Sequence, residues 1–503
     1  MARIAVIGAG MGAMAAAARL AVAGHRVVVY ERTATYGGAV RRFERDGFAF
    51  DTGPGLLHLP AVYRDLFIKT GKESLEDTVE LVQVDPASRH VFADGTAVSL
   101  PNASRAGVVT ALDEALGAGA GGRWGDFLVR AREAWDRTRR PLLEEPLWPN
   151  WQVLAEQEPY PAVPHKRLLR TRRARTLAEV GEWELRDERL TALLHSYALA
   201  HGLDPRTAPA SAAVLPYMEH AFGAWYVRGG MRELARAVYE RCLKRRVEFV
   251  FDAEVGRVLD KDGRATGVEL RDGTVAEADH VVADVHPAQL KLLTGRQLDK
   301  NGDVQADPYP TGPGRLALLL ALRGGREAGA AHRTVVHAPD PDSELDFLAS
   351  ADEGRPPAPT VTVLRPDDPA LAPEGGHESV VVSAMVPSTV DWEDEAVLRQ
   401  YTDHLLDAAQ EAIPGLRDRV LWQETRTPDD AENETDAFLG TVPAPSLAAG
   451  RGRFLHPANT TRLPGLYRVG GWSHPGGGLP HAGMSGALVA GLIVEGPEFR
   501  GSQ

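Results

Sequence analysis

The chain has 503 residues, of which 44% are hydrophobic and 25% are charged, so we expect a soluble globular protein of two or three domains. The net charge of −13 argues against a nucleic-acid partner. Cys242 is the only cysteine, which excludes an internal disulfide and fits a reducing compartment. Because no apolar run reaches about eighteen residues, we expect no transmembrane helix and a cytoplasmic location.

The first thirty residues have the pattern of a βαβ unit. Residues 4–7 are a short apolar run, typical of a buried parallel strand. Residues 14–23 are rich in alanine and predict a helix, and residues 26–30 predict a second strand. The turn between the first strand and the helix reads Gly8-Ala9-Gly10-Met11-Gly12-Ala13. This order of strand, glycine-rich turn, helix and strand predicts a dinucleotide site.

Each part of this unit has a physical role. Gly8 permits the tight turn, Gly10 lets the backbone approach a pyrophosphate, and Ala13 allows the helix to pack closely on the strand. The helix N-terminus directs free N–H groups and a positive dipole at the phosphates. Glu31 follows Gly10 by 21 residues, where its carboxylate can accept hydrogen bonds from both hydroxyls of an adenosine ribose.

Further glycines follow the βαβ unit. Gly37 and Gly38 indicate a second approach of the backbone to the cofactor, although two surface turns would have the same pattern. Gly53 and Pro54 end a predicted half-buried strand. Residues 81–100 are predicted to form a β-meander.

Residues 103–205 are predicted to be mostly helical. Their aromatic side chains, Trp124 and Phe127 among them, favour a hydrophobic core, with the lining of an apolar tunnel as the alternative. Residues 165–175 include six Lys or Arg residues. We expect a solvated helix face there; the alternative is a patch that contacts an anionic membrane surface.

The second half of the chain alternates strands, loops and helices. Residues 300–315 and 352–376 are rich in Pro, Gly and Asp and are predicted to be loops. Helices are predicted at residues 232–243 and 393–412. Strands are predicted at residues 247–251, 254–259, 267–270 and 279–283, and those of a second sheet at residues 316–322, 334–338, 360–364 and 379–386.

The last informative stretch has the same order of elements as the N-terminus. A short strand ends in Gly470-Gly471, a Gly/Pro-rich loop follows, and residues 481–494 predict a helix of small residues. The glycines let the backbone approach a flat or charged group. The helix dipole would stabilise negative charge, such as that on N1 and the C2 oxygen of a reduced flavin.

Through the motifs at its two ends and between them, the chain resembles the phytoene-desaturase-like flavoproteins, within the amine-oxidase and glutathione-reductase-type FAD superfamily. The resemblance spans nearly the whole length and rests on residues 4–31, 47–54, 215–231, 278–287 and 462–487. It implies an α/β fold with a Rossmann-type, GR2-like FAD-binding domain assembled from discontinuous segments, a mixed-sheet substrate domain and a helical subdomain. The FAD-binding segments are expected at 1–80, 206–290 and 441–503, the substrate domain at 81–104 and 291–440, and the helical subdomain at 105–205.

The resemblance also implies bound FAD and no separate NAD(P) domain. The ADP half would lie on the N-terminal unit, the strand near Val255 would offer its backbone to the adenine, and the C-terminal loop and helix would flank the isoalloxazine. The predicted cofactor contacts are Gly8, Gly10, Met11, Gly12, Ala13, Glu31, Arg32, Gly37, Gly38, Ala39, Gly53, Pro54, Val255, Gly470, Gly471, Pro480, Gly483 and Met484.

Two positions depart from the family pattern. Ala39 stands directly after the paired glycines, where family members usually carry an arginine that neutralises FAD phosphate. Arg32, Arg41 or Arg42 can substitute for it. His481 opens the last helix in place of a small or apolar residue, where its side chain could face the flavin.

The leading functional prediction is an FAD-dependent oxidoreductase acting on CH–CH bonds, with hydride transfer between flavin N5 and a carbon of a lipophilic polyene of isoprenoid or polyketide origin. The acid/base candidates are His481, Tyr226 and His220. A redox-neutral isomerase or cyclase of a polyene precursor is one alternative. A flavin-free binding protein like the GDP-dissociation inhibitors is another. The expected partner is a lipophilic small molecule, with at most peripheral membrane contact, and no metal site is expected.

Overall fold

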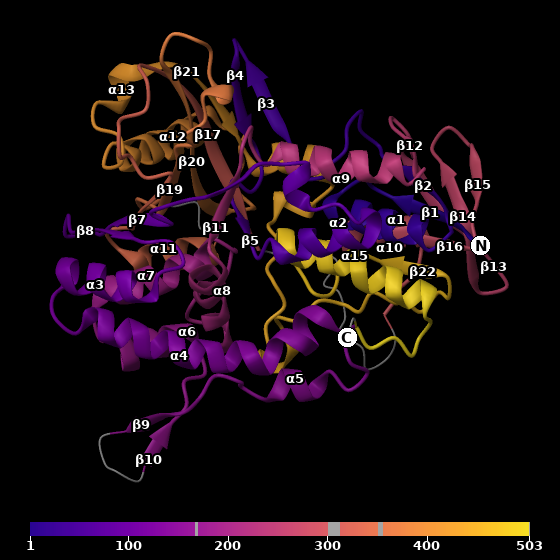
Figure 1. Ribbon diagram of the computed structural model, residues 1–503, viewed down its shortest axis with the longest axis horizontal. Coiled ribbons are helices and arrows are strands. Elements are labelled where there is room, and N and C mark those ends of the chain that lie inside the picture. The colour runs from indigo at the N-terminus through magenta and orange to yellow at the C-terminus, as the bar shows by residue number, and fades with distance from the viewer. Residues whose placement is uncertain (166–169, 300–311, 351–355, 502–503) are drawn as a thin grey trace.

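The computed structural model describes residues 1–165, 170–299, 312–350 and 356–501 (Figure 1). A five-stranded, fully parallel sheet has the strand order β12-β2-β1-β16-β22. All apolar residues of β1 are buried, as expected for a parallel strand that is covered on both faces. These strands are β1 (Arg3–Ile7), β2 (Arg26–Tyr30), β12 (Glu248–Val250), β16 (His280–Ala283) and β22 (Leu466–Arg468).

Helices cover one face of this sheet. Helix α1 (Met11–Val22) packs against α15 (Leu479–Val494) and α9 (Arg232–Lys244), and α2 (Ala61–Gly71) packs on α15. Their alanine-rich surfaces form one core with the inner residues of the strands. The other face is covered by the antiparallel sheet β13 (Val255–Lys261), β14 (Arg264–Leu270) and β15 (Val275–Glu277), together with α10 (Pro287–Thr294).

A seven-stranded sheet lies beside this unit, at the upper left of Figure 1. Its two longest strands, β17 and β20, pair over their full length, from Pro313↔Pro387 to Arg323↔His377. The sheet is mixed, because β18 pairs in parallel with β7 while the other neighbours are antiparallel. In sheet order the strands are β21 (Val420–Arg426), β17 (Pro313–Arg323), β20 (His377–Pro387), β19 (Val361–Leu364), β18 (Arg333–Val336), β7 (Ser88–Val91) and β8 (Ala97–Leu100).

The two faces of β17 differ because side chains alternate along a strand. Leu316 and Leu318 point into a core with α12 (Glu395–Ala409). Leu319 and Ala321 point to the opposite face and pack against Phe48 and Phe50 of β4. The elements around this sheet include β3 (Arg42–Arg45), β4 (Phe48–Asp51), α11 (Pro341–Ser350), α13 (Leu416–Arg419) and α14 (Pro428–Thr435).

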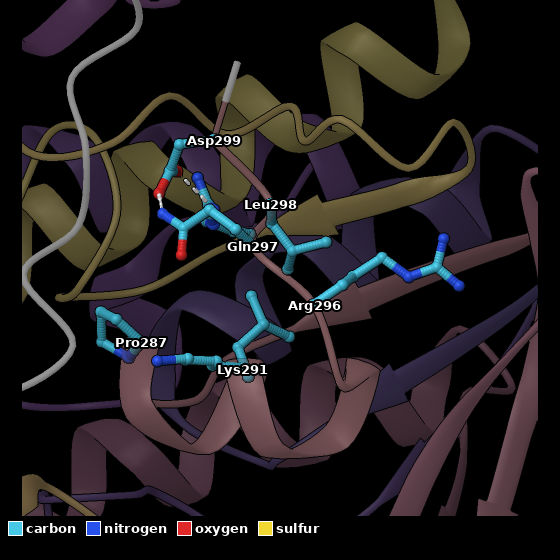
Figure 2. A pocket seen from close by; sticks show the side chains of 8 residues that line it. Pro287, Lys291, Arg296, Gln297, Leu298 and Asp299 are labelled. Carbon is cyan, nitrogen blue, oxygen red and sulfur yellow. Dashed lines mark hydrogen bonds and ion pairs between the residues drawn. The ribbon is translucent and has the colours of Figure 1, made fainter. Parts of the chain in front are cut away.

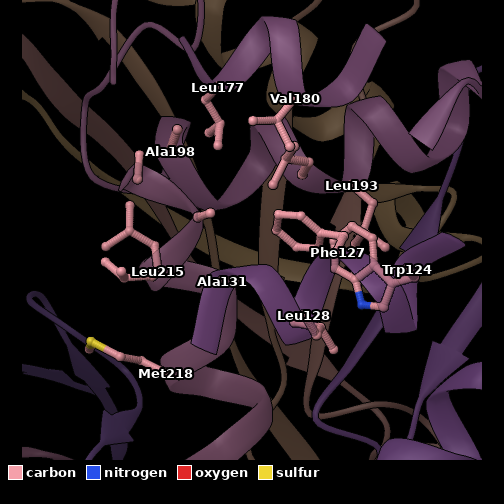
Figure 3. Packing of buried hydrophobic residues seen from close by; sticks show 14 of the residues in the cluster. Trp124, Phe127, Leu128, Ala131, Leu177, Val180, Leu193, Ala198, Leu215 and Met218 are labelled. Atoms are coloured by element: carbon pink, nitrogen blue, oxygen red, sulfur yellow. The ribbon is translucent and has the colours of Figure 1, made fainter. Parts of the chain in front are cut away.

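The helical region occupies the lower left of Figure 1. Trp124 and Phe127 have no exposed surface and belong to one large apolar cluster (Figure 3). These two aromatic side chains are therefore core residues, as predicted, and not the wall of a tunnel. The helices are α3 (Arg105–Leu116), α4 (Ala120–Arg139), α5 (Gln152–Glu156), α6 (Leu177–Val180), α7 (Glu188–Leu199) and α8 (Val214–Phe222).

The expected fold class is confirmed, but two local predictions are wrong. The basic segment is not a helix face, because β9 (Val163–His165) and β10 (Arg170–Arg172) form an antiparallel hairpin; residues 166–169 lie outside the described part. Residues 81–100 are not one meander either. Strand β6 (Leu81–Gln83) pairs with β11 (Ala224–Val227), which also pairs with β5 (Leu57–His58), so β6 joins a different sheet from β7 and β8.

The predicted loops at 300–315 and 352–376 lie partly outside the described residues. Within the described ranges, no helix is both long and apolar enough to cross a membrane.

Candidate active site

One large cleft runs along the carboxyl ends of β1, β2 and β16, the edge where parallel α/β sheets bind ligands. It holds about 2110 Å³ of empty space, part of it open to solvent, and it continues to the first residues of β17. A second pocket, of about 290 Å³, lies beside α10 (Figure 2), where Arg468 forms an ion pair with Asp299 at 2.7 Å. The second pocket is lined by none of the predicted site residues.

The cleft begins at the glycine-rich turn. Gly8 has a φ of +89°, and a Cβ there would lie 2.9 Å from the carbonyl oxygen of Asp284. A Cβ on Gly10 would collide with the Asp284 carboxylate, and one on Gly12 would lie 2.8 Å from Cα of Gly470. These glycines are thus required for packing within the protein, in addition to the predicted approach of a pyrophosphate.

Glu31 lies at the end of β2 with its carboxylate held in place. Oε2 accepts a hydrogen bond from the N–H of Ala9 at 2.8 Å, and Oε1 accepts from the N–H and the hydroxyl of Thr33 at 2.9 and 2.8 Å. A carboxylate oxygen has two lone pairs, so Oε2 keeps acceptor capacity on the cleft side. This fits the predicted contact with ribose hydroxyls.

We expect Glu31→Gln to weaken FAD binding about tenfold, because a glutamine amide has one acceptor oxygen for two backbone N–H groups and leaves one of them unpaired. Fluorescence titration of the apoprotein with FAD measures this. Glu248→Gln, at an exposed ion pair on β12, is the matched control and should bind FAD as the wild type does. Equal affinities of Glu31→Gln and the control would contradict the role of Glu31.

The paired glycines lie directly against the first turn. The N–H of Gly37 donates to the carbonyl of Ala9 at 2.8 Å, and a Cβ on Gly38 would lie 3.0 Å from Cα of Gly10. Ala39 follows them on the cleft wall, where a methyl group offers no hydrogen bond to a phosphate.

Of the three arginines near Ala39, Arg41 lies at this turn and forms no ion pair with a described carboxylate. Arg41 lines the cleft and donates to the carbonyl oxygens of Gly38 and Glu434, each at 3.0 Å. Arg32 also lines the cleft but forms an ion pair with Asp436 at 3.0 Å. Arg42 is turned toward Glu233 and the carbonyl of Gly229 and does not line the cleft.

The C-terminal segment closes the other side of the cleft. Gly470 and Gly471 line it, and so does Leu479, the first residue of α15. Ser485 fixes this loop by accepting a hydrogen bond from the N–H of Gly470 at 3.0 Å and donating one to the carbonyl of His474 at 3.0 Å. Ser485 was not predicted as a site residue, because its hydrogen-bond partners are distant in the chain.

Most predicted cofactor contacts are brought together on this one cleft, and four are not. Ala13 is buried in the helix core. A Cβ on Gly483 would meet Val62, so this residue faces α2, and Met484 packs against the helical region. The lining residues among the predicted contacts are Gly8, Gly10, Met11, Gly12, Glu31, Arg32, Gly37, Gly38, Ala39, Gly53, Pro54, Val255, Gly470 and Gly471, while Ala13, Pro480, Gly483 and Met484 lie outside the lining.

Asp284 is a cleft residue that was not predicted from the sequence. It follows β16, and its Oδ2 accepts a hydrogen bond from the N–H of Ala13 at 3.1 Å. Burial, together with the charge of Glu31, raises the pKa of this carboxyl to about 7. Its position directly after a buried parallel strand is the signal that would have identified it.

None of the three acid/base candidates lines the cleft. Tyr226 donates its hydroxyl to Asp368 at 2.9 Å, and Nε2 of His220 lies 3.4 Å from the hydroxyl of Tyr197. His481 is buried, and its Nδ1 has no hydrogen-bond partner among the described residues. This Nδ1 lies next to Gly478, a residue that lines the cleft: a Cβ on Gly478 would lie 3.4 Å from it. Burial lowers the pKa of His481 to about 3, so its ring is neutral.

Arg315, on β17, and His201, just after α7, are among the other polar side chains that line the cleft. Burial lowers the pKa of His201 to about 4, and the nearby charge of Arg315 contributes to this shift. No group of His, Cys, Asp and Glu residues in the described ranges has the arrangement of a metal site.

A parallel sheet with two glycine-rich turns at its carboxyl edge, a carboxylate held at the end of β2 and an arginine beside the turn is the arrangement of a dinucleotide-binding fold. The chain belongs to the family of flavin-containing amine oxidoreductases, whose model matches residues 14–494. FAD is accordingly its cofactor, and the protein is an FAD-dependent oxidoreductase.

Full-length relatives support this assignment. The chain is 30% identical to a 4,4'-diapolycopene oxygenase of Methylomonas sp, over 98% of each chain. It is 29% identical to a zeta-carotene-forming phytoene desaturase of Myxococcus xanthus, over 97% of this chain and 93% of the relative. An oxidoreductase of Methanosarcina mazei has the same fold, with a TM-score of 0.64 and 19% identity over 97% of this chain and 99% of that structure.

Proposed function

We propose that this enzyme desaturates or reduces a CH–CH bond of a lipophilic polyene, with hydride transfer between flavin N5 and a substrate carbon. The observation that carries the proposal is the full-length similarity to a diapolycopene oxygenase and a phytoene desaturase, enzymes named for polyene substrates. The large cleft supports it, because the space continues from the glycine-rich turn to β17 and so has room for a substrate beside the cofactor.

FAD supplies two-electron hydride chemistry when it is bound. The chain contributes binding, orientation and exclusion of water. Glu31, Arg41 and the glycine turn would hold the ADP half, and Gly470 and Gly471 would lie against the isoalloxazine. The N-terminus of α15 would stabilise negative charge there.

A proton must leave or enter the carbon next to the one that exchanges hydride. His201 lines the cleft, and its low pKa keeps the ring in the neutral form that can accept a proton. His481, Tyr226 and His220 remain proposed acid/base groups; each would need to act from outside the cleft lining.

The test starts with an absorption spectrum of the purified protein before and after anaerobic reduction with dithionite. The oxidised flavin bands should bleach. Phytoene is then added to the holoenzyme, and the product is followed by its longer-wavelength absorption together with oxygen or quinone consumption. Loss of hydrogen from phytoene with matching acceptor consumption supports the proposal, and an enzyme that leaves phytoene unchanged with either acceptor contradicts desaturation of this substrate.

The same experiment separates the alternatives. An isomerase or cyclase would convert the substrate without consuming an acceptor. A flavin-free binding protein would remain colourless after incubation with FAD, and membership of a flavin-containing family does not favour it. The cytoplasmic location and any peripheral membrane contact remain predictions from the sequence.

A further inference from the structure

Arg315 stands at the start of β17 on the face that is directed at the cleft. It alternates with Leu316, which points into the core with α12, and it shares its face with Ala317, which also lines the cleft. The turn after α7 lies close by, because a Cβ on Gly202 would lie 3.1 Å from Pro313 of the same strand. Arg315 is therefore held on a long, fully paired strand and not on a loop.

Four arginines line the cleft, and they differ in their partners. Arg32 pairs with Asp436, and Arg426 pairs with Asp430 and Glu434. Arg41 lies beside the glycine turn, where FAD phosphates are expected. Arg315 is the fourth. It forms no ion pair with a described residue, and it does not lie beside the glycine turn.

Among the described residues, the guanidinium of Arg315 makes one hydrogen bond, from Nη2 to the carbonyl of Ala200 at 3.1 Å. A guanidinium has five N–H donors, so most of its donors have no protein partner among the described residues. Burial lowers the pKa of Arg315, and no carboxylate acts in the opposite direction. The side chain is half-buried and faces the open cleft, so its free donors are within reach of an anionic group of a ligand bound there.

The neighbouring groups indicate how many negative charges this anion carries. Arg426, on the neighbouring strand β21, is already paired with Asp430 and Glu434, and burial lowers the pKa of His201, so the wall near Arg315 presents one unpaired positive charge. A phosphate or diphosphate ester carries two or more negative charges and is usually bound by several cations. A carboxylate carries one and matches the planar guanidinium in a bidentate pair.

We propose that Arg315 binds a carboxylate group of the polyene substrate, so that the enzyme prefers a polyene with an acidic end to an uncharged one. This inference rests on the proposed function, since it assigns a chemical class to the substrate of the same cleft. Arg315 then fixes which end of an otherwise uniform chain enters, and hence which bond lies at the flavin.

The holoenzyme and its variants are titrated with all-trans-retinoic acid and with its methyl ester, two probes that differ in one negative charge. Wild type should bind the acid at least about tenfold more tightly than the ester. In Arg315→Gln this preference should disappear while the affinity for the ester stays unchanged, and Arg315→Lys should retain part of it. Arg323→Gln, at the exposed end of the same strand, should behave as wild type.

Any one of four results would overturn the inference. Equal binding of acid and ester by wild type, or an equal loss of both in Arg315→Gln, would show that no carboxylate is recognised at this position. Loss of the flavin absorption band in Arg315→Gln would place the arginine in the cofactor site. If wild type bound neither probe and also failed to bind lycopene, the proposed polyene substrate itself would be wrong.

Discussion

The variant Arg41→Ala is expected to bind FAD about a hundredfold more weakly than wild type and to be purified largely without flavin. Arg41 is the cleft arginine beside the glycine turn that no carboxylate neutralises among the described residues. Hydrogen bonds to charged groups contribute about 1.5–3 kcal/mol, and the variant loses a cation together with its donors. The measurement is the ratio of flavin to protein absorption after purification, followed by titration of the apoprotein with FAD.

Arg42→Ala is the matched control. It removes the same side chain from the next position, where the guanidinium lies outside the cleft and contacts Glu233. This variant should keep its flavin. If Arg42→Ala lost FAD and Arg41→Ala retained it, the guanidinium that replaces the family's arginine at position 39 would be Arg42.

The choice among the three arginines shows where prediction from sequence stops. The βαβ unit was predictable because the strand, the glycine turn and the helix are adjacent in sequence and each depends on local preferences. The partners that distinguish the arginines come from elsewhere: Asp436 for Arg32 and Glu233 for Arg42. Sequence spacing contains no information about such pairings.

The same limit applies to the acid/base candidates. Tyr226 was predicted from its aromatic motif, but β11 pairs with β5 and β6, and the hydroxyl reaches Asp368, which is 142 residues away. Arg315 and His201, in contrast, line the cleft but were not predicted from the sequence. Each is an isolated polar residue at the end of a regular element, and only the approach of α7 to β17 places both on the cleft.

Asp284→Asn is expected to stabilise the apoprotein at pH 8 by up to about 4 kcal/mol and to leave its stability at pH 4 nearly unchanged. Burial raises the pKa of the Asp284 carboxyl from 3.8 to about 7 in the folded protein. Between these two values the folded state holds a proton that the unfolded state has released, so stability falls as the pH rises from about 4 to about 7. A shift of about three units corresponds to about 4 kcal/mol.

Asparagine keeps an oxygen that can accept the N–H of Ala13 and has no charge to bury, so its stability should not follow this pH dependence. Thermal or urea unfolding of both apoproteins between pH 4 and pH 8 measures the difference in their stability. Burial also raises the pKa of Asp51, to about 6, but Asp51 is present in both proteins and its contribution cancels in the difference. The variant should also bind FAD more tightly above pH 7, because an ionised Asp284 beside the glycine turn repels the diphosphate. A constant stability difference between the two proteins across this range would show that Asp284 does not titrate near pH 7.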